Sequence, residues 1–152
     1  MEIASSPVYV DTSALAKLYV PEPWSDELEA VLVGRRDVMV SDLAVTELTS
    51  ALARRVRDDE VSRADARRVY QRVLRDIESG EFQRGDLTAG THREAERLLL
   101  AVGSRTALRA ADALHLALAG LLGARVFLTF DKRMSAAAEA LGTLELPARN
   151  LV

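Results

Sequence analysis

Two short apolar segments of this sequence each end abruptly at an aspartate, and this feature constrains the fold more than any other. Residues 7–10 precede Asp11, and residues 126–130 precede Asp131. Runs of β-branched and aromatic residues are typical of strands that are buried on both faces. Such strands occur mainly in parallel sheets that are covered by helices on both sides. The sequence therefore predicts an α/β fold.

The segments between the predicted strands carry the apolar spacing and the capping residues of helices. In one of them, Val45, Leu48, Leu52 and Val56 recur at steps of three and four residues, as on one helical face. We expect helices over residues 12–19, 25–33, 42–56, 62–79, 91–102, 108–122 and 135–141, with further strands at 37–40 and 82–87. Because no repeat or linker interrupts this pattern, we expect a single domain over residues 1–152.

Composition and short motifs exclude several classes of protein. The sequence has no cysteine, which rules out disulfides, thiolate metal ligands and a cysteine nucleophile. Its formal net charge is −3, so any attraction to a nucleic acid must be local. The glycine-rich loops that bind nucleotide phosphates are missing. There is also no leader-like segment and no apolar run of membrane-spanning length, so we expect a cytoplasmic protein without a membrane partner.

Four acidic residues stand in positions that favour a shared site. Asp11 and Asp131 follow predicted strands, whose carboxyl ends form the ligand-binding edge of a parallel sheet. Glu47 and Asp112 lie on predicted helices among apolar neighbours, and a partly buried Asp112 needs a cation or hydrogen-bond donors. Converging carboxylates would repel one another without a cation. Oxygen-only ligation favours Mg²⁺ or Mn²⁺, which suits phosphodiester hydrolysis.

Each of these acids also has a purely structural interpretation. Asp11 and Asp131 could each cap the helix that follows, and Glu47 could form a surface ion pair with Arg54. His115 lies one helical turn after Asp112, which is a position suited to a general base. The alternative for this histidine is a hydrogen-bonded imidazole within the helix packing. We favour that alternative and assign it no catalytic role.

Arginines are concentrated in the two predicted helices that span residues 42–79. Several of them stand four residues before an acid, which predicts self-paired, solvated helical faces. The expected pairs are Arg54 with Asp58, Arg55 with Asp59, and Arg72 with Asp76. In the functional alternative, some of the arginines bind RNA phosphates beside an acidic groove, or the apolar stripes hold a partner helix. The arginines concerned are Arg54, Arg55, Arg57, Arg63, Arg67, Arg68, Arg72 and Arg75.

Four segments together resemble a known family. Residues 8–15, 45–48, 110–117 and 128–134 resemble PIN-domain proteins, in particular the VapC-like toxins of type II toxin–antitoxin systems. The resemblance runs from Val8 to about Leu146, and the order and separation of the segments make it specific. It implies a PIN-like three-layer α/β/α domain with a mostly parallel central sheet and a protruding helical hairpin.

The activity that the resemblance implies is that of a metal-dependent endoribonuclease toxin. Such an enzyme hydrolyses phosphodiester bonds of single-stranded RNA by metal-activated water, with Mg²⁺ or Mn²⁺ as cofactor. A cognate VapB-like antitoxin would inhibit it, and the chain would form a homodimer. By the same resemblance, the catalytic and metal-binding residues would be Asp11, Glu47, Asp112 and Asp131, with Ser13 and Thr129 as polar support.

Two other classes of function remain open from the residues alone. A catalytically inactive PIN-like module could bind RNA or act as a scaffold, although the complete acidic quartet argues against this. A receiver-type signalling domain would accept a phosphoryl group on a strand-end aspartate. That domain requires an acidic pair at the first strand end, where Thr12 and Ser13 instead follow Asp11.

Overall fold

The computed structural model describes residues 6–149, and its centre is a parallel sheet of four strands with the order β3-β2-β1-β4. The strands are β1 (Val8–Val10), β2 (Val38–Ser41), β3 (Gln83–Gly85) and β4 (Val126–Leu128). Adjacent strands pair in parallel throughout. The α/β prediction is therefore confirmed, including a strand within residues 82–87.

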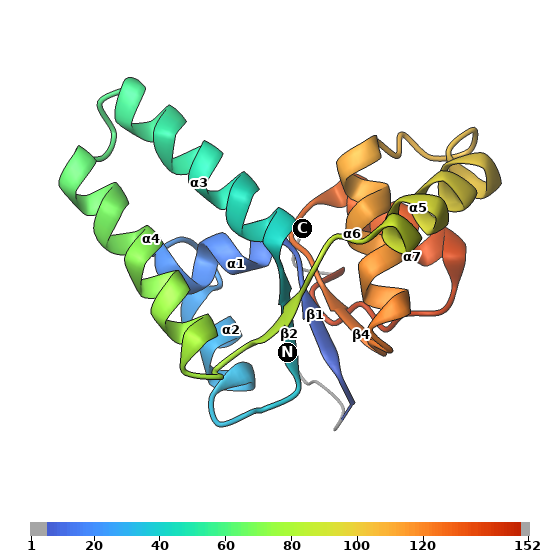
Figure 1. Ribbon diagram of the computed structural model, residues 1–152, viewed down its shortest axis with the longest axis horizontal. Helices are drawn as coiled ribbons and strands as arrows, with labels where there is room; N and C mark the ends of the chain where they lie inside the picture. The colour runs from blue at the N-terminus through green and yellow to red at the C-terminus, as the bar shows by residue number, and fades with distance from the viewer. Residues whose placement is uncertain (1–5, 150–152) are drawn as a thin grey trace.

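Helices cover both faces of this sheet and form the three layers that the resemblance implied (Figure 1). One layer contains α1 (Thr12–Tyr19), α2 (Ser25–Leu32), α3 (Asp42–Arg57) and α4 (Arg63–Glu78). The other contains α5 (Ala89–Val102), α6 (Ala110–Leu121) and α7 (Lys132–Leu141). The tip of the α3–α4 hairpin extends beyond the sheet, as expected. Within residues 6–149, no helix is both long and apolar enough to cross a membrane.

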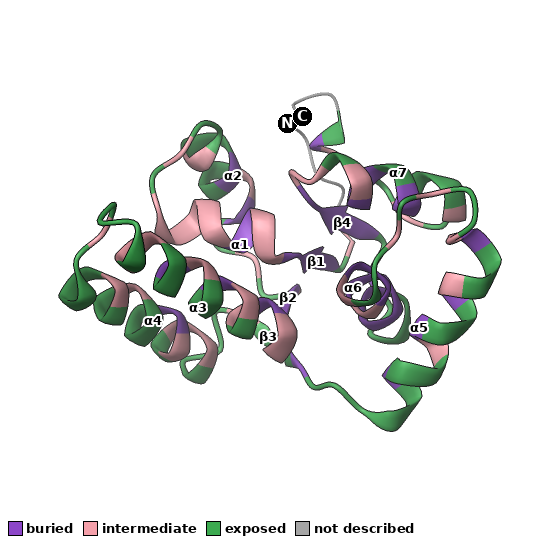
Figure 2. Cartoon of the chain, turned by 90° about the horizontal axis from the view of Figure 1, so that it is seen from above, coloured by how far each residue is buried: buried purple, intermediate pink, exposed green. Residues whose placement is uncertain are grey.

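Alternate residues of β1, β2 and β4 pack into two separate cores, because successive side chains point to opposite faces of a sheet. Val8 and Val10 pack into the core beneath the α1–α4 layer. Tyr9 points the other way, into the core beneath α5, α6 and α7, together with Met39 and Phe127. In Figure 2, β1, β2 and β4 are coloured as buried, as is much of α6. This alternation decides which β1 side chain can reach α6.

Element boundaries differ from the sequence prediction where side chains compete for backbone groups. The α7 helix begins at Lys132 and not at residue 135, because the Asp131 side chain accepts hydrogen bonds from the backbone N–H groups of Arg133 and Met134. The β4 strand ends at Leu128 and not at residue 130. The backbone N–H of Phe130 donates to a serine side chain instead of continuing the strand pairing.

The expected ion pairs between residues four apart on α3 and α4 are wrong. Within the described chain, Arg54, Arg55 and Arg72 form no ion pair with the acids that follow them at that spacing. Arg55 instead binds Glu22 at 2.6 Å, and the Arg72 guanidinium lies over the ring of Tyr19 at 5.5 Å. Arg55 and Arg72 thus contact Glu22 and Tyr19, in the loop after α1 and in α1 itself, and not the acids four residues further along the hairpin.

Candidate active site

The four carboxylates predicted from the sequence line one cavity of about 340 Å³ at the carboxyl edge of the sheet. The parallel pairing of β1 with β4 brings the ends of these strands together, and the backbone N–H of Asp11 donates to the Leu128 carbonyl at 3.1 Å. The first turn of α6, the N-cap of α7 and the second turn of α3 supply the remaining acids. The four acidic residues in the wall are Asp11, Glu47, Asp112 and Asp131.

Asp11 is the most deeply buried of these acids, at 2% exposure. Its Oδ1 accepts hydrogen bonds from the Ser13 hydroxyl at 2.7 Å and from the backbone N–H of Ala14 at 3.0 Å. Burial raises the pKa of the Asp11 carboxyl, and hydrogen bonds from Thr129 and Ser13 oppose that rise in part. No ion pair within residues 6–149 engages Asp11, so its direct partners are hydrogen-bond donors.

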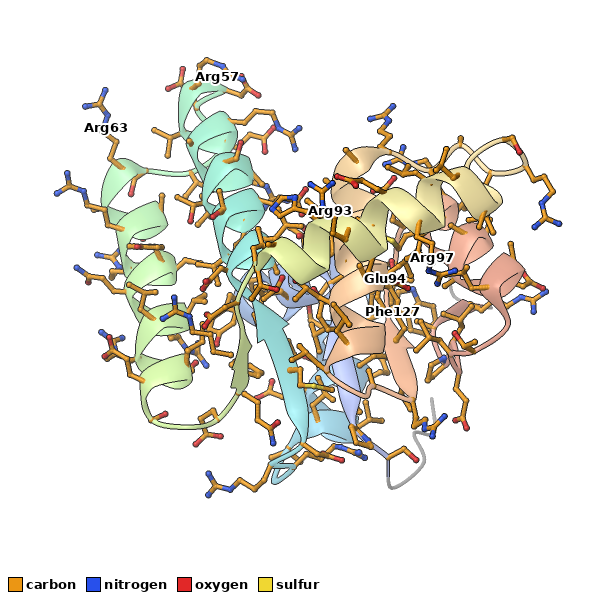
Figure 3. The ribbon with its side chains drawn as sticks, turned by 45° about the vertical axis from the view of Figure 1, so that its right-hand side comes forward. Arg57, Arg63, Arg93, Glu94, Arg97 and Phe127 are labelled. Atoms are coloured by element: carbon orange, nitrogen blue, oxygen red, sulfur yellow. The ribbon has the colours of Figure 1, made fainter. Side chains whose placement is uncertain are left out.

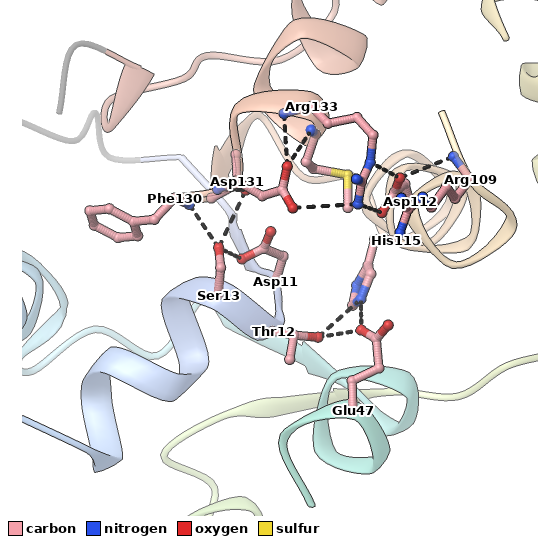
Figure 4. A network of polar contacts seen from close by, with 12 residues as sticks. Asp11, Thr12, Ser13, Glu47, Arg109, Asp112, His115, Phe130, Asp131 and Arg133 are labelled. Atoms are coloured by element: carbon pink, nitrogen blue, oxygen red, sulfur yellow. Dashed lines mark hydrogen bonds and ion pairs between the residues drawn. The ribbon is translucent and has the colours of Figure 1, made fainter. Parts of the chain in front are cut away.

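Arg133 neutralises the acids on α6 and α7 (Figure 4). Its Nε donates to Oδ2 of Asp112 at 2.8 Å, and its Nη2 lies 3.5 Å from Oδ2 of Asp131. Asp112 is 7% exposed and also accepts a hydrogen bond from the backbone N–H of Arg109 at 3.0 Å. The expectation that Asp112 is buried and needs a partner is therefore met. Arg133 was not identified as that partner from the sequence. Its position in the helical turn that follows Asp131 could have indicated a basic side chain close to these acids.

Glu47 is held by side chains from two other elements. Its Oε2 accepts a hydrogen bond from the Thr12 hydroxyl at 2.5 Å and lies 2.8 Å from Nε2 of His115. The hydrogen bond from His115 is the main cause of a lowered pKa of the Glu47 carboxyl. The alternative ion pair of Glu47 with Arg54 is not formed. His115 is 2% exposed, as in the interpretation of a hydrogen-bonded imidazole within the helix packing.

The capping interpretation and the shared cavity are both correct descriptions of three acids. Asp11 caps α1, and Asp131 caps α7. Asp112 accepts the backbone N–H of Arg109 at the start of α6. A carboxylate at a helix N-terminus is stabilised by the helix dipole, so each of these acids is fixed with its carboxylate near the sheet edge. The helix caps therefore hold these side chains at the cavity.

The supporting polar residues lie in the same region. Ser13 lines the cavity, and its hydroxyl lies 3.4 Å from the hydroxyl of Thr129. The Thr129 hydroxyl accepts a hydrogen bond from the backbone N–H of Asp131 at 3.1 Å. These two side chains thus connect the start of α1 to the segment after β4.

The donor set suits a hard divalent cation. Its candidate ligands are carboxylate and hydroxyl oxygens, which Mg²⁺ and Mn²⁺ prefer. In the part of the chain that the structure describes, the buried Asp11 carboxylate forms no ion pair. In the described residues, no group of three or more histidine and acidic side chains is arranged to hold one ion. The residues fit the cation by donor chemistry, while Arg133 engages two of the four carboxylates.

A family model of the PIN domain matches residues 8–140. This chain belongs to the PIN-domain family. The resemblance found in the sequence is thereby confirmed, and the cavity of this PIN domain contains all four acids that the resemblance indicated.

Relatives of this PIN domain include two ribonucleases from Mycobacterium tuberculosis. It is 36% identical to Ribonuclease VapC46 over 143 residues, which cover 89% of this chain and 92% of the relative. It is 33% identical to Ribonuclease VapC45 over 150 residues, covering 93% and 96% of the two chains. The crystal structure of VapC20 from the same organism, a toxin that cleaves the sarcin–ricin loop, matches the fold with a TM-score of 0.66. That match has 24% identity and covers 86% of this chain and 94% of the other.

Proposed function

We propose that this protein is a metal-dependent endoribonuclease that hydrolyses phosphodiester bonds of single-stranded RNA. One observation carries the proposal: carboxylates from four separate elements line one cavity at the carboxyl edge of a parallel sheet. Ligands bind at this edge in α/β folds. The similarity to proteins named VapC ribonucleases over most of the chain supports RNA as the substrate class.

Asp11, Glu47, Asp112 and Asp131 would hold Mg²⁺ or Mn²⁺ in this proposal. When bound, such a cation stabilises charge on phosphoryl oxygens and lowers the pKa of a coordinated water molecule. Ser13 and the buried Thr129 keep the Asp11 and Asp131 segments together. No nucleophilic side chain is needed, so the chain's own task is to position carboxylates and substrate.

Substrate binding requires positive charge, because an acidic cavity repels an anionic strand. Arg54, Arg55 and Arg133 stand in the cavity wall beside the carboxylates. Arg55 and Arg133 are engaged by acids, whereas no hydrogen bond or ion pair within residues 6–149 engages Arg54. Arg54 is therefore the cavity arginine that is free to bind an RNA phosphate.

The test is cleavage of a labelled single-stranded RNA in Mg²⁺ or Mn²⁺, with and without a chelator. We expect cleavage that the chelator abolishes, and a loss of about 100-fold or more in Asp11→Asn and Asp112→Asn. Glu94→Gln is the matched control, because Glu94 pairs with Arg97 on α5, outside the cavity (Figure 3). RNA binding without cleavage by the wild-type protein would instead favour an inactive RNA-binding module.

We propose further that this protein acts in the cytoplasm as a toxin, as a homodimer that a VapB-like antitoxin inhibits. The support is the likeness to VapC proteins over nearly their whole length. Sedimentation of the purified chain tests the dimer. Co-expression with the product of an adjacent small reading frame tests the antitoxin, which should form a complex with the chain and suppress RNA cleavage.

A further inference from the structure

Tyr9 places a polar group at the base of the candidate site, although its strand otherwise consists of core residues. The side chain is fully buried, and its ring stacks on Phe127 with centroids 5.4 Å apart and planes 10° apart. Its hydroxyl donates to Oγ of Ser41 at 2.9 Å and lies 2.8 Å from Nδ1 of His115. Burial raises the pKa of Tyr9, so the hydroxyl keeps its proton.

The far side of the His115 ring faces the cavity. Nε2 lies 2.8 Å from Oε2 of Glu47 and 3.2 Å from the Thr12 hydroxyl. Because an ionised carboxylate can only accept hydrogen bonds, Nε2 carries the hydrogen and donates to Glu47. Because Tyr9 donates its one hydroxyl hydrogen to Ser41, the Tyr9 oxygen accepts from Nδ1–H of His115. A continuous chain of hydrogen bonds therefore runs from the buried Tyr9 hydroxyl through His115 to a cavity carboxylate.

We propose that Tyr9 is a positioning residue, which fixes the His115 ring so that Nε2–H holds the Glu47 carboxylate at the cavity. A histidine that holds a ligand in place needs its own second nitrogen held, and such outer partners orient the groups they support. Removing the hydroxyl leaves Nδ1 in the core without its tyrosine partner, and buried groups without a partner favour rearrangement. This inference rests on the proposed function, because it gives Glu47 a role in binding the cation.

A comparison of two tyrosines separates positioning from stability. Tyr9→Phe keeps the stacked ring and removes only the hydroxyl. Tyr19→Phe is the matched control, because the Tyr19 hydroxyl also donates a side-chain hydrogen bond, to Oδ2 of Asp76 at 2.6 Å, but on α1 and outside this cavity. Tyr9→Phe loses the contacts of the hydroxyl with Ser41 and His115, and Tyr19→Phe loses the hydrogen bond to Asp76, so both variants should be less stable to heat.

Binding of Mn²⁺, measured by titration calorimetry, should distinguish them. We expect Tyr9→Phe to bind Mn²⁺ roughly 10-fold more weakly and Tyr19→Phe to bind as the wild type does. In a Glu47→Gln background, Tyr9→Phe should have little further effect, because the hydroxyl acts through Glu47. Equal weakening in both backgrounds, or unchanged affinity in Tyr9→Phe, would overturn the inference.

A metal-free readout keeps this test separate from the proposed function. In chelator, the His115 Nε2 proton should give a slowly exchanging NMR signal in the wild type and in Tyr19→Phe. We expect the signal to be lost in Tyr9→Phe, and its persistence there would refute positioning by Tyr9. If the wild-type protein binds no Mn²⁺ and cleaves no RNA, the proposed function fails, while this spectrum still decides whether Tyr9 positions the imidazole.

Discussion

Nε of Arg133 donates to Oδ2 of Asp112 at 2.8 Å and thereby joins the first turn of α7 to the first turn of α6. This ion pair is partly shielded, with the Asp112 side chain 10% and the Arg133 side chain 28% exposed. The arginine therefore compensates a buried charge that a divalent cation would otherwise compensate. Stability and metal affinity should respond to its removal in opposite directions.

Arg133→Met should destabilise the metal-free protein and tighten its binding of Mn²⁺. The free energy of unfolding should fall by about 1–3 kcal/mol, because Asp112 loses its charged partner. Affinity for Mn²⁺ should rise roughly tenfold, since a positive charge no longer opposes the cation. Chemical denaturation in chelator and titration calorimetry measure the two effects.

Arg97→Met is the matched control for that variant. It breaks an exposed pair with Glu94, which should change stability by less than about 0.5 kcal/mol and leave Mn²⁺ affinity unchanged. Weaker Mn²⁺ binding by Arg133→Met would show that the arginine supports a metal site and does not oppose it.

Asp11→Asn should stabilise the metal-free protein at neutral pH. The raised pKa of the buried Asp11 carboxyl means that the folded state holds a proton where the unfolded chain has lost it. Stability therefore falls as pH rises from the ordinary aspartate range toward the raised value. Asparagine avoids this loss and still caps α1. We expect a melting temperature in chelator about 2–4 °C higher, for a gain of about 1 kcal/mol.

The pH dependence provides the check on this explanation. The advantage of Asp11→Asn should shrink as pH is lowered toward 3.8, the ordinary pKa of an aspartate, because both proteins then carry a neutral group. Asp26→Asn, at an exposed site on α2, is the control for loss of one acidic side chain and should not raise the melting temperature. An advantage that grows on acidification would contradict the assignment to burial of the charge.

Two substitutions at Asp131 should separate its capping role from its proposed catalytic role. Asp131→Asn keeps an oxygen that accepts the N–H groups of Arg133 and Met134, so stability should change little. Asp131→Ala removes the cap and should cost about 1–2 kcal/mol. Both should lose RNA cleavage. Retained cleavage in Asp131→Asn would leave capping as the role of this residue.

Arg54→Ala should weaken RNA binding through loss of a phosphate contact. Binding of a fluorescent single-stranded RNA is measured over a salt series in Ca²⁺, a cation chosen to limit cleavage. The slope of log K against log salt should become shallower by roughly 0.7, the value of one phosphate contact. Arg63→Ala is the control, because Arg63 lies at the far tip of the α3–α4 hairpin (Figure 3). An equal effect in both variants would indicate general charge attraction.

The fold and the four acids could be predicted because they follow from local patterns. The apolar strands and the capped amphipathic helices each depend on residues close together in the chain, and parallel pairing then brings strand ends to one edge. Asp11 lies at that edge because it follows β1 directly, and Asp131 lies there because it caps α7 three residues after β4 ends. The boundary of α7 was wrong because the strength of the Asp131 cap depends on side-chain geometry.

The partners of those acids were decided only by the tertiary structure. Arg133 could have faced solvent or any carboxylate, and only the packing of α7 against the start of α6 brings it to Asp112. Tyr9 and His115 are 106 positions apart, and their contact depends on which face of β1 packs against α6. The spacing of residues in the sequence determines which side chains share a face of one helix or strand. The distances between side chains of different elements depend on how the faces of those elements pack against each other.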